Sequence, residues 1–84
     1  MNMLFLYDTF KPYCERNGVH LLRDDLRYIA TQLRVIPPDR HRYVMRDYYN
    51  IWMQGMADAK IKASAQNIGR NKANTWLREI CCGV

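Results

Sequence analysis

Long apolar runs and patterned cysteines are what this chain most clearly lacks. No stretch approaches the roughly 20 apolar residues of a membrane-spanning helix, and no basic segment precedes the short apolar run near the start, as it would in a secretory signal. The three cysteines, Cys14, Cys81 and Cys82, are an odd set, and a disulfide between the adjacent pair would be strained. We therefore expect a cytoplasmic protein without a membrane span or a disulfide framework.

Alternation of apolar and polar residues, the mark of a half-buried strand, is also scarce. Glycine and proline are few, at four and three residues, and apolar residues make up 49% of the chain. Helical spacing of these apolar residues dominates, and their abundance favours folding over disorder. The sequence predicts an all-α protein, a single helical domain over residues 1–84 built as a compact bundle of three to four helices.

The helical pattern falls into four segments, residues 3–16, 20–35, 38–58 and 64–80. Pro12 disturbs the first segment, so either the helix is kinked there or it starts near Thr9. Gly18 is the expected left-handed stop after it, and Pro38 suits the first turn of the third helix. The fourth segment is either one helix or a turn followed by a helix.

Each segment has an apolar stripe that we expect to be buried. In chain order the stripes consist of Met3, Leu6, Phe10 and Cys14; Leu22, Leu26, Ile29 and Leu33; Met45, Tyr48, Trp52, Met56 and Ala59; and Ile61, Ala65, Ile68, Ala73, Trp76, Leu77 and Ile80.

The fourth segment combines positive charge with a polar face. Residues 60–84 hold five Lys and Arg residues against Glu79, a net of +4 out of +5 for the chain. Such a field attracts nucleic acid or an acidic protein surface, although a basic solvated helix face has the same composition. Arg and Asn contact base edges, and Lys neutralises phosphates. We expect an outward face that binds nucleic acid through Lys60, Lys62, Arg70, Asn71, Lys72, Asn74 and Arg78.

Aromatic residues and methionine gather in the third segment, beyond its buried stripe. A helix that is apolar all round is either central in the bundle or partly committed to a partner. Tyr, Trp, Met and Arg are enriched at binding hot spots. If Tyr43, Tyr49 and Met53 stay exposed after packing, they form a partner-binding surface; otherwise they complete a small core.

Catalytic and metal-binding patterns are missing. The two histidines, His20 and His41, fall in different segments, and the adjacent Asp24 and Asp25 point in different directions on a helix. The sequence contains no glycine-rich phosphate loop, no zincin helix and no C-x-x-C pair. We expect a protein that is not an enzyme and has no catalytic residues, metal or cofactor.

Two resemblances concern the second half of the chain. Residues 63–78, with "AQNIGRNKANTWLR", resemble the turn and second helix of a helix-turn-helix module, which implies a left-handed turn at Asn67 and a recognition helix opening at Arg70. Residues 36–80 join a proline-started helix rich in Arg and aromatics to "RNKANTWLRE" and resemble small helical accessory proteins of bacteriophages and prophages. That resemblance implies a protein that binds a host enzyme or nucleoprotein.

Two functions are therefore expected. The first is a non-enzymatic phage-type accessory protein that binds nucleic acid, or a nucleic-acid-bound protein complex, through its last helix. The alternative is a protein–protein inhibitor or adaptor, for host takeover or against host defence, that binds one host protein through the third helix. A second copy of the chain is a further candidate partner.

Overall fold

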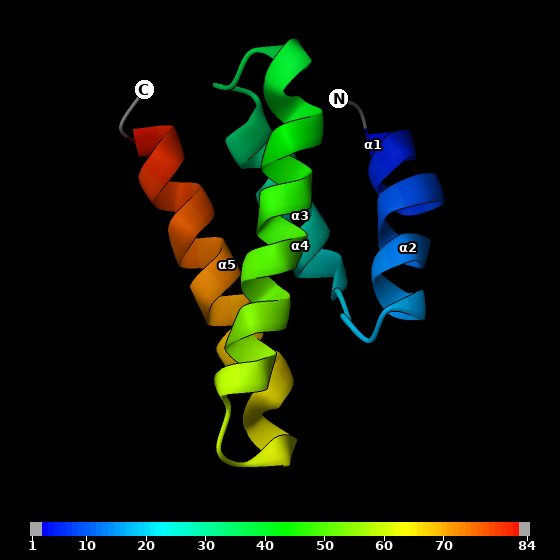
Figure 1. Ribbon diagram of the computed structural model, residues 1–84. Coiled ribbons are helices and arrows are strands. Elements are labelled where there is room, and N and C mark those ends of the chain that lie inside the picture. The colour runs from blue at the N-terminus through cyan, green and yellow to red at the C-terminus, as the bar shows by residue number, and fades with distance from the viewer. Residues whose placement is uncertain (1–2, 83–84) are drawn as a thin grey trace.

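The chain folds into helices along nearly its whole length. The computed structural model describes residues 3–82, with only the backbone for Met3, and in this range it contains no strand. The elements are α1 (Met3–Phe5), η1 (Leu6–Phe10), α2 (Lys11–Arg16), α3 (Arg23–Leu33), η2 (Pro38–Arg40), α4 (His41–Asp58), η3 (Lys62–Ser64) and α5 (Ala65–Cys82) (Figure 1). The prediction of an all-α bundle is confirmed.

The first three elements follow one another without a break and form one N-terminal helix, residues 3–16. Its second element, η1, is a π turn in which the Lys11 N–H donates to the Leu6 carbonyl, five residues back. Pro12 has no N–H to donate, and its ring would crowd the preceding turn of an α-helix. The wider π turn accommodates this proline, so the expected alternative of a helix starting near Thr9 is wrong.

The N-terminal helix ends at a left-handed glycine, as predicted. Gly18 has a φ of 83°, its N–H donates to the Glu15 carbonyl at 3.2 Å, and the Val19 N–H donates to the Cys14 carbonyl at 2.8 Å. These two bonds form a Schellman motif. The predicted stripe of this helix is buried at Leu6, Phe10 and Cys14, whereas the side chain of Met3 lies outside the described residues.

Helix α3 begins three residues later than predicted. Leu22 is extended, with φ −85° and ψ 162°, and 56% of it is exposed, so it belongs to the cap and not to the buried stripe. The Asp25 carboxylate accepts a hydrogen bond from the Leu22 N–H at 2.8 Å, which caps the start of the helix. At the other end, the buried His41 Nε2 donates to the Leu33 and Ile36 carbonyls at 2.9 and 2.7 Å.

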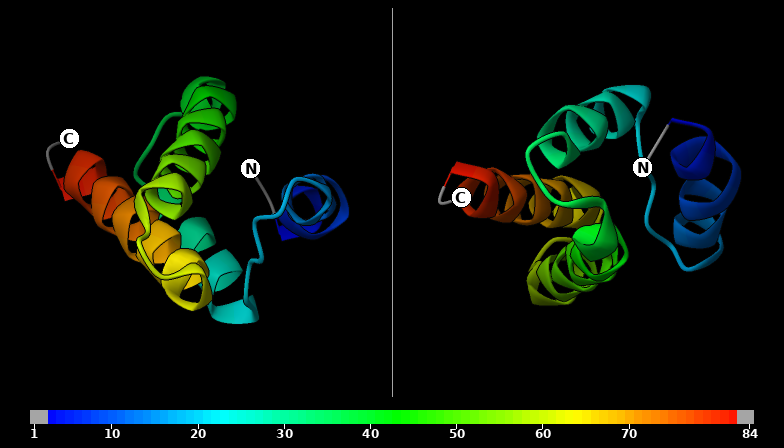
Figure 2. Two further views of the ribbon diagram at one scale, coloured as in Figure 1. Left: turned by 60° about the horizontal axis from the view of Figure 1, so that its bottom comes forward. Right: turned by 90° about the horizontal axis from the view of Figure 1, so that it is seen from above.

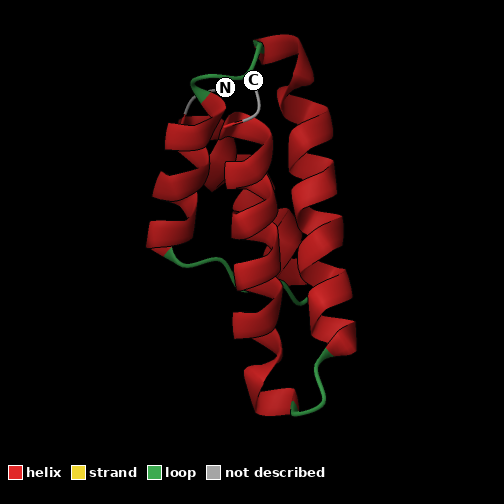
Figure 3. Ribbon diagram, turned by 90° about the vertical axis from the view of Figure 1, so that its left-hand side faces the viewer, coloured by secondary structure: helices red, strands yellow, loops and turns green. Residues whose placement is uncertain are grey.

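Helices α4 and α5 form an antiparallel pair, which is the most extensive contact in the molecule (Figure 3). They cross at two glycines, because a Cβ atom added to Gly55 would lie 2.9 Å from the Gly69 Cα atom. Helix α3 packs against both α5 and the N-terminal helix, which lie on opposite sides of the molecule (Figure 2). The described part of the chain has no helix whose length and apolar character would let it cross a bilayer.

The predicted stripes of α4 and α5 differ in outcome. In the α4 stripe, Met45, Tyr48 and Trp52 are buried as predicted, whereas Met56 and Ala59 are only partly buried. In α5 only two stripe residues, Ala73 and Leu77, are fully buried, and Ile61, before the helix, is 66% exposed. The apolar core consists of Leu6, Phe10, Cys14, Val19, Leu21, Leu26, Ile29, Leu33, Ile36, Met45, Tyr48, Trp52, Ala73 and Leu77.

The glycine crossing yields a stability prediction. In Gly69→Ala the new Cβ atom would lie 2.6 Å from both the Cδ1 atom and the carbonyl oxygen of Trp52. We expect the free energy of unfolding in urea to fall by about 1–3 kcal/mol, because overpacking outweighs the gain in helix propensity. Asn71→Ala, at an exposed position of the same helix, is the control and should be neutral or slightly stabilising. Equal stability of the two variants would contradict the close crossing.

Candidate functional site

The guanidinium of Arg70 points into the protein and not toward solvent. Its Nε atom donates to the Asp25 Oδ2 atom at 2.9 Å, and the two side chains are only 16% and 4% exposed. Its other nitrogens donate to the Asn67 Oδ1 atom at 2.8 Å and to the His20 carbonyl at 3.0 Å. The guanidinium also lies over the Trp52 ring, 5.0 Å from the centroid. Each of the three guanidinium nitrogens therefore donates at least one hydrogen bond within the chain.

Asn74 is held in the same way, one turn further along α5. Its Nδ2 atom donates to the Asp25 Oδ1 atom at 3.2 Å, and its Oδ1 atom accepts from the Tyr48 hydroxyl at 2.5 Å. Burial raises the pKa of Tyr48, with the Asp25 charge adding to the shift. The phenol therefore stays protonated and remains a donor.

Gln66, one turn before Arg70, completes a row of inward polar side chains. Its Oε1 atom accepts from the His20 N–H and from the Trp52 indole N–H, each at 3.1 Å, and its Nε2 atom donates to the Gly18 carbonyl at 2.7 Å. We call Gln66, Arg70 and Asn74, with their partner Asp25, the polar seam. It joins α5 to α4, to the start of α3 and to the loop before it.

The expectation that α5 turns its amide and guanidinium face outward is therefore wrong for Arg70 and Asn74. A carboxylate as buried as that of Asp25 needs donors, and residues spaced four apart on α5 lie along the side that faces it. The turn expected at Asn67 is absent as well, because residues 65–82 form one continuous helix and no non-glycine residue between 3 and 82 has a positive φ.

The other five residues predicted to bind nucleic acid are exposed: Lys60, Lys62, Asn71, Lys72 and Arg78. They lie in the loop after α4, at the start of η3 and on the outer side of α5. Lys72 pairs with Asp58 at 3.3 Å on the surface, which reduces its contribution to the local field. The seven predicted residues thus do not form one continuous face.

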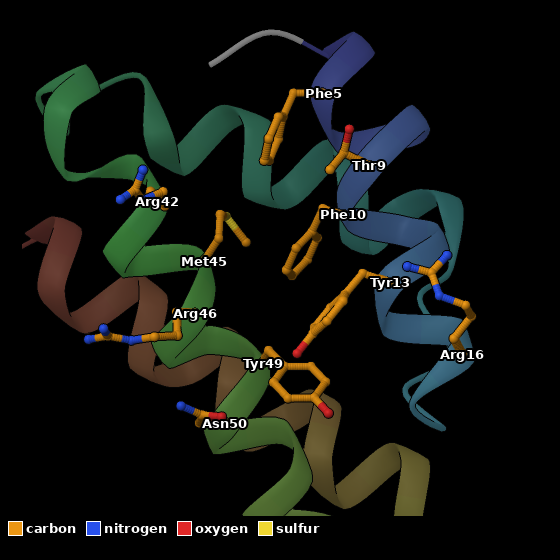
Figure 4. Close-up of a pocket in the computed structure, with 10 residues that line it drawn as sticks. All are labelled: Phe5, Thr9, Phe10, Tyr13, Arg16, Arg42, Met45, Arg46, Tyr49 and Asn50. Atoms are coloured by element: carbon orange, nitrogen blue, oxygen red, sulfur yellow. The ribbon is translucent and has the colours of Figure 1, made fainter.

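A second site lies between the N-terminal helix and α4. The walls enclose a groove of about 330 Å³, and Figure 4 shows the side chains that line it. We call it the aromatic groove; it is lined by Phe5, Thr9, Phe10, Tyr13, Arg16, Arg42, Met45, Arg46, Tyr49 and Asn50. Phe10 and Met45 point into the space between the helices (Figure 4) and are 5% and 3% exposed, so they form its floor.

Two tyrosines close one end of the aromatic groove. The rings of Tyr13 and Tyr49 point toward one another from opposite walls (Figure 4), with their centroids 5.2 Å apart. The pKa of Tyr49 is raised, mainly by burial and next by the neighbouring Tyr13. This pair ties the end of the N-terminal helix to the middle of α4.

The rim of the aromatic groove is basic. Arg42 and Arg46 of α4 and Arg16 of α2 contribute to its lining, and their guanidinium groups point away from Phe10 and Met45 (Figure 4). Among the ten described residues that line the groove, none is acidic. The guanidinium carbons of Arg42 and Arg46 lie 5.8 and 5.5 Å from the centroid of the Tyr43 ring. Arg46 also approaches Asp47 at 3.3 Å, in a pair that is largely exposed.

Of the three predicted partner-binding residues, only Tyr49 is among those that line this groove. Tyr43 is 53% exposed on α4, and Met53 is half-buried against the core. Sequence reasoning missed the opposite wall, formed by the N-terminal helix. The signal was present, because Phe5, Thr9, Tyr13 and Arg16 recur at helical spacing beside the buried stripe.

The two histidines and Cys14, for which no chemical role is expected, lie in different surroundings. His20 is exposed and His41 is buried at the end of α3. Burial, aided by the Glu15 charge, raises the pKa of the Cys14 thiol to about 12. Within residues 3–82, no cluster of three or more His, Cys, Asp or Glu side chains is arranged to hold a metal ion.

Comparison of the chain with protein-family models, with curated proteins and with solved structures gives no match.

The polar seam predicts unequal roles for two adjacent carboxylates. Asp25→Ala leaves the Arg70 guanidinium partly buried without its counter-charge, so we expect the free energy of unfolding to fall by about 3 kcal/mol. Asp24→Ala removes an exposed neighbour in the first turn of α3 and should cost less than about 1 kcal/mol. Urea unfolding followed by circular dichroism measures both. Similar losses in the two variants would contradict the seam.

The thiols should also react unequally. At about pH 8 the Cys14 thiol stays protonated in the folded protein because its pKa is raised to about 12, and only the thiolate is a nucleophile. Cys82 is exposed and should be alkylated by iodoacetamide, as mass spectrometry of the peptides would show. Cys14 should react only after unfolding. Alkylation of both residues at one rate under native conditions would contradict this burial.

Proposed function

We propose that the protein is not an enzyme and acts as a protein-binding inhibitor or adaptor, whose partner docks in the aromatic groove. The supporting observation is the concentration of Tyr, Phe, Met and Arg side chains around one groove on α4. These residue types dominate binding energy at interfaces, especially where a pocket shields them from water. The sequence pointed to the same helix through Tyr43 and Tyr49.

The groove is favoured over the nucleic-acid face of α5. Arg70 and Asn74 were the central residues of that face, and both already bond within the polar seam. To reach a base edge they would have to leave Asp25 unpaired in the interior, which is costly. The exposed Lys60, Lys62 and Arg78 add long-range attraction for an acidic partner without carrying sequence readout.

The partner is best sought in a bacterial cytoplasm. This choice rests on the resemblance of residues 36–80 to phage accessory proteins and on the reduced cysteines. An affinity-tagged copy, incubated with a bacterial lysate with and without nuclease, should retain a protein in both conditions. Loss of that protein after nuclease treatment would favour the nucleic-acid function instead.

Groove variants connect the retained protein to this site. Thr9 is exposed and lines the groove, so Thr9→Trp should fill it without removing a core contact and lower capture at least about tenfold. Thr75→Trp makes the same change at an exposed position of α5 and should leave capture unchanged. Tyr49→Ala should also weaken capture. Full capture by both Thr9→Trp and Tyr49→Ala would reject the groove as the binding site.

A further inference from the structure

The walls of the aromatic groove restrict how a partner can bind. Both are helices, the N-terminal helix and α4, whose backbone N–H and C=O groups bond within the helix. A partner strand would find no open backbone edge to pair with, so recognition must use side chains. An amphipathic helix laid between two helices meets this requirement, with apolar residues at i, i+3 or i+4, and i+7 entering the groove.

The dimensions of the groove fit a short helical segment. Its lining residues run from Phe5 to Arg16 on one wall and from Arg42 to Asn50 on the other. At 1.5 Å per residue these stretches are roughly 12–16 Å long, or two to three helical turns. The volume of about 330 Å³ accepts a few anchoring side chains over Phe10 and Met45. A larger surface of a partner would rest on the rim.

The positive charge of the groove favours acidic residues at the edges of that segment. Arg16, Arg42 and Arg46 line the groove, and Figure 4 shows their guanidinium groups on the outer parts of its walls, directed away from Phe10 and Met45. The ring of Tyr43 lies against two of them, which restricts their orientation before binding. Arginine pairs with carboxylates in a bidentate manner. A basic segment would meet like charge on both walls, because no lining residue among the described ones is acidic.

We propose that the occupant of the aromatic groove is an acidic amphipathic helix of a partner protein. Its apolar residues contact Phe5, Phe10 and Met45, and its Asp or Glu residues pair with Arg16 on one side and with Arg42 and Arg46 on the other. This inference rests on the proposed function, because it names the chemistry of the partner that the groove holds.

Three synthetic peptides of about 14 residues, a length at which isolated helices are marginally stable, test the occupant. The first carries Leu and Phe on one face and Glu on the other, the second has Lys in place of Glu, and the third has the composition of the first in an order without an apolar face. Fluorescence anisotropy should give a dissociation constant at least about tenfold lower for the first peptide than for the others. Comparable binding of the second peptide, or no binding of the first, would overturn the proposal.

Variants that replace arginine with glutamine show which residues favour the acidic peptide. The double variant Arg42→Gln with Arg46→Gln should weaken binding of the Glu peptide about tenfold and flatten its salt dependence. Arg23→Gln with Arg27→Gln removes two exposed charges from α3, away from the groove lining, and is the matched control. Equal affinities for these two double variants would overturn the proposal.

The two hypotheses fail in different ways. If Thr9→Trp prevents protein capture but the three peptides bind alike, the groove is a binding site and its acidic selectivity is wrong. If Thr9→Trp and Tyr49→Ala change neither capture nor peptide binding, both hypotheses are wrong. Self-association of the protein in sedimentation experiments, lost in Thr9→Trp, would assign the groove to a second copy and overturn the acidic-helix proposal.

Discussion

The buried carboxylate of Asp25 is the group on which the arrangement of the helices depends. It caps α3 by accepting from the Leu22 N–H and at the same time accepts from Arg70 and Asn74 of α5. One side chain thus caps the start of one helix and joins that helix to another. Since a buried charge is tolerated only when it is paired, α5 must present its guanidinium and amide groups to α3 in one rotation and register.

That rotation determines which surfaces remain for binding. With Arg70 and Asn74 turned inward, the outer side of α5 keeps scattered cations and no ordered set of donors for base edges. The pair of α5 and α4 is close because Gly55 and Gly69 meet at their crossing. On the opposite side of α4 the N-terminal helix makes contact through the Tyr13–Tyr49 pair and leaves a groove above it. Aromatic side chains and arginines are concentrated at that groove.

Prediction from the sequence succeeded where the physical signal is local. The left-handed Gly18, the short η2 helix that begins at Pro38 and leads into α4, and the buried Met45, Tyr48 and Trp52 follow from backbone preferences and from spacing along one helix. The π turn that accommodates Pro12 could not be predicted in this way, because a kinked helix and a helix that starts near Thr9 relieve the same clash equally well. The binding face of α5 was predicted wrongly because periodicity separates polar from apolar residues but does not say which polar residues are buried.

Composition and spacing were enough to establish an all-α bundle and to identify the helix that is richest in aromatic residues, since helix formation depends on neighbours three and four residues away. The inward turn of Arg70 depends on Asp25, which is 45 positions away in the chain, and the aromatic groove depends on residues 5–16 meeting residues 42–50. Such pairs form when the helices pack, because burial and counter-charge are properties of the assembled helices and not of any one segment.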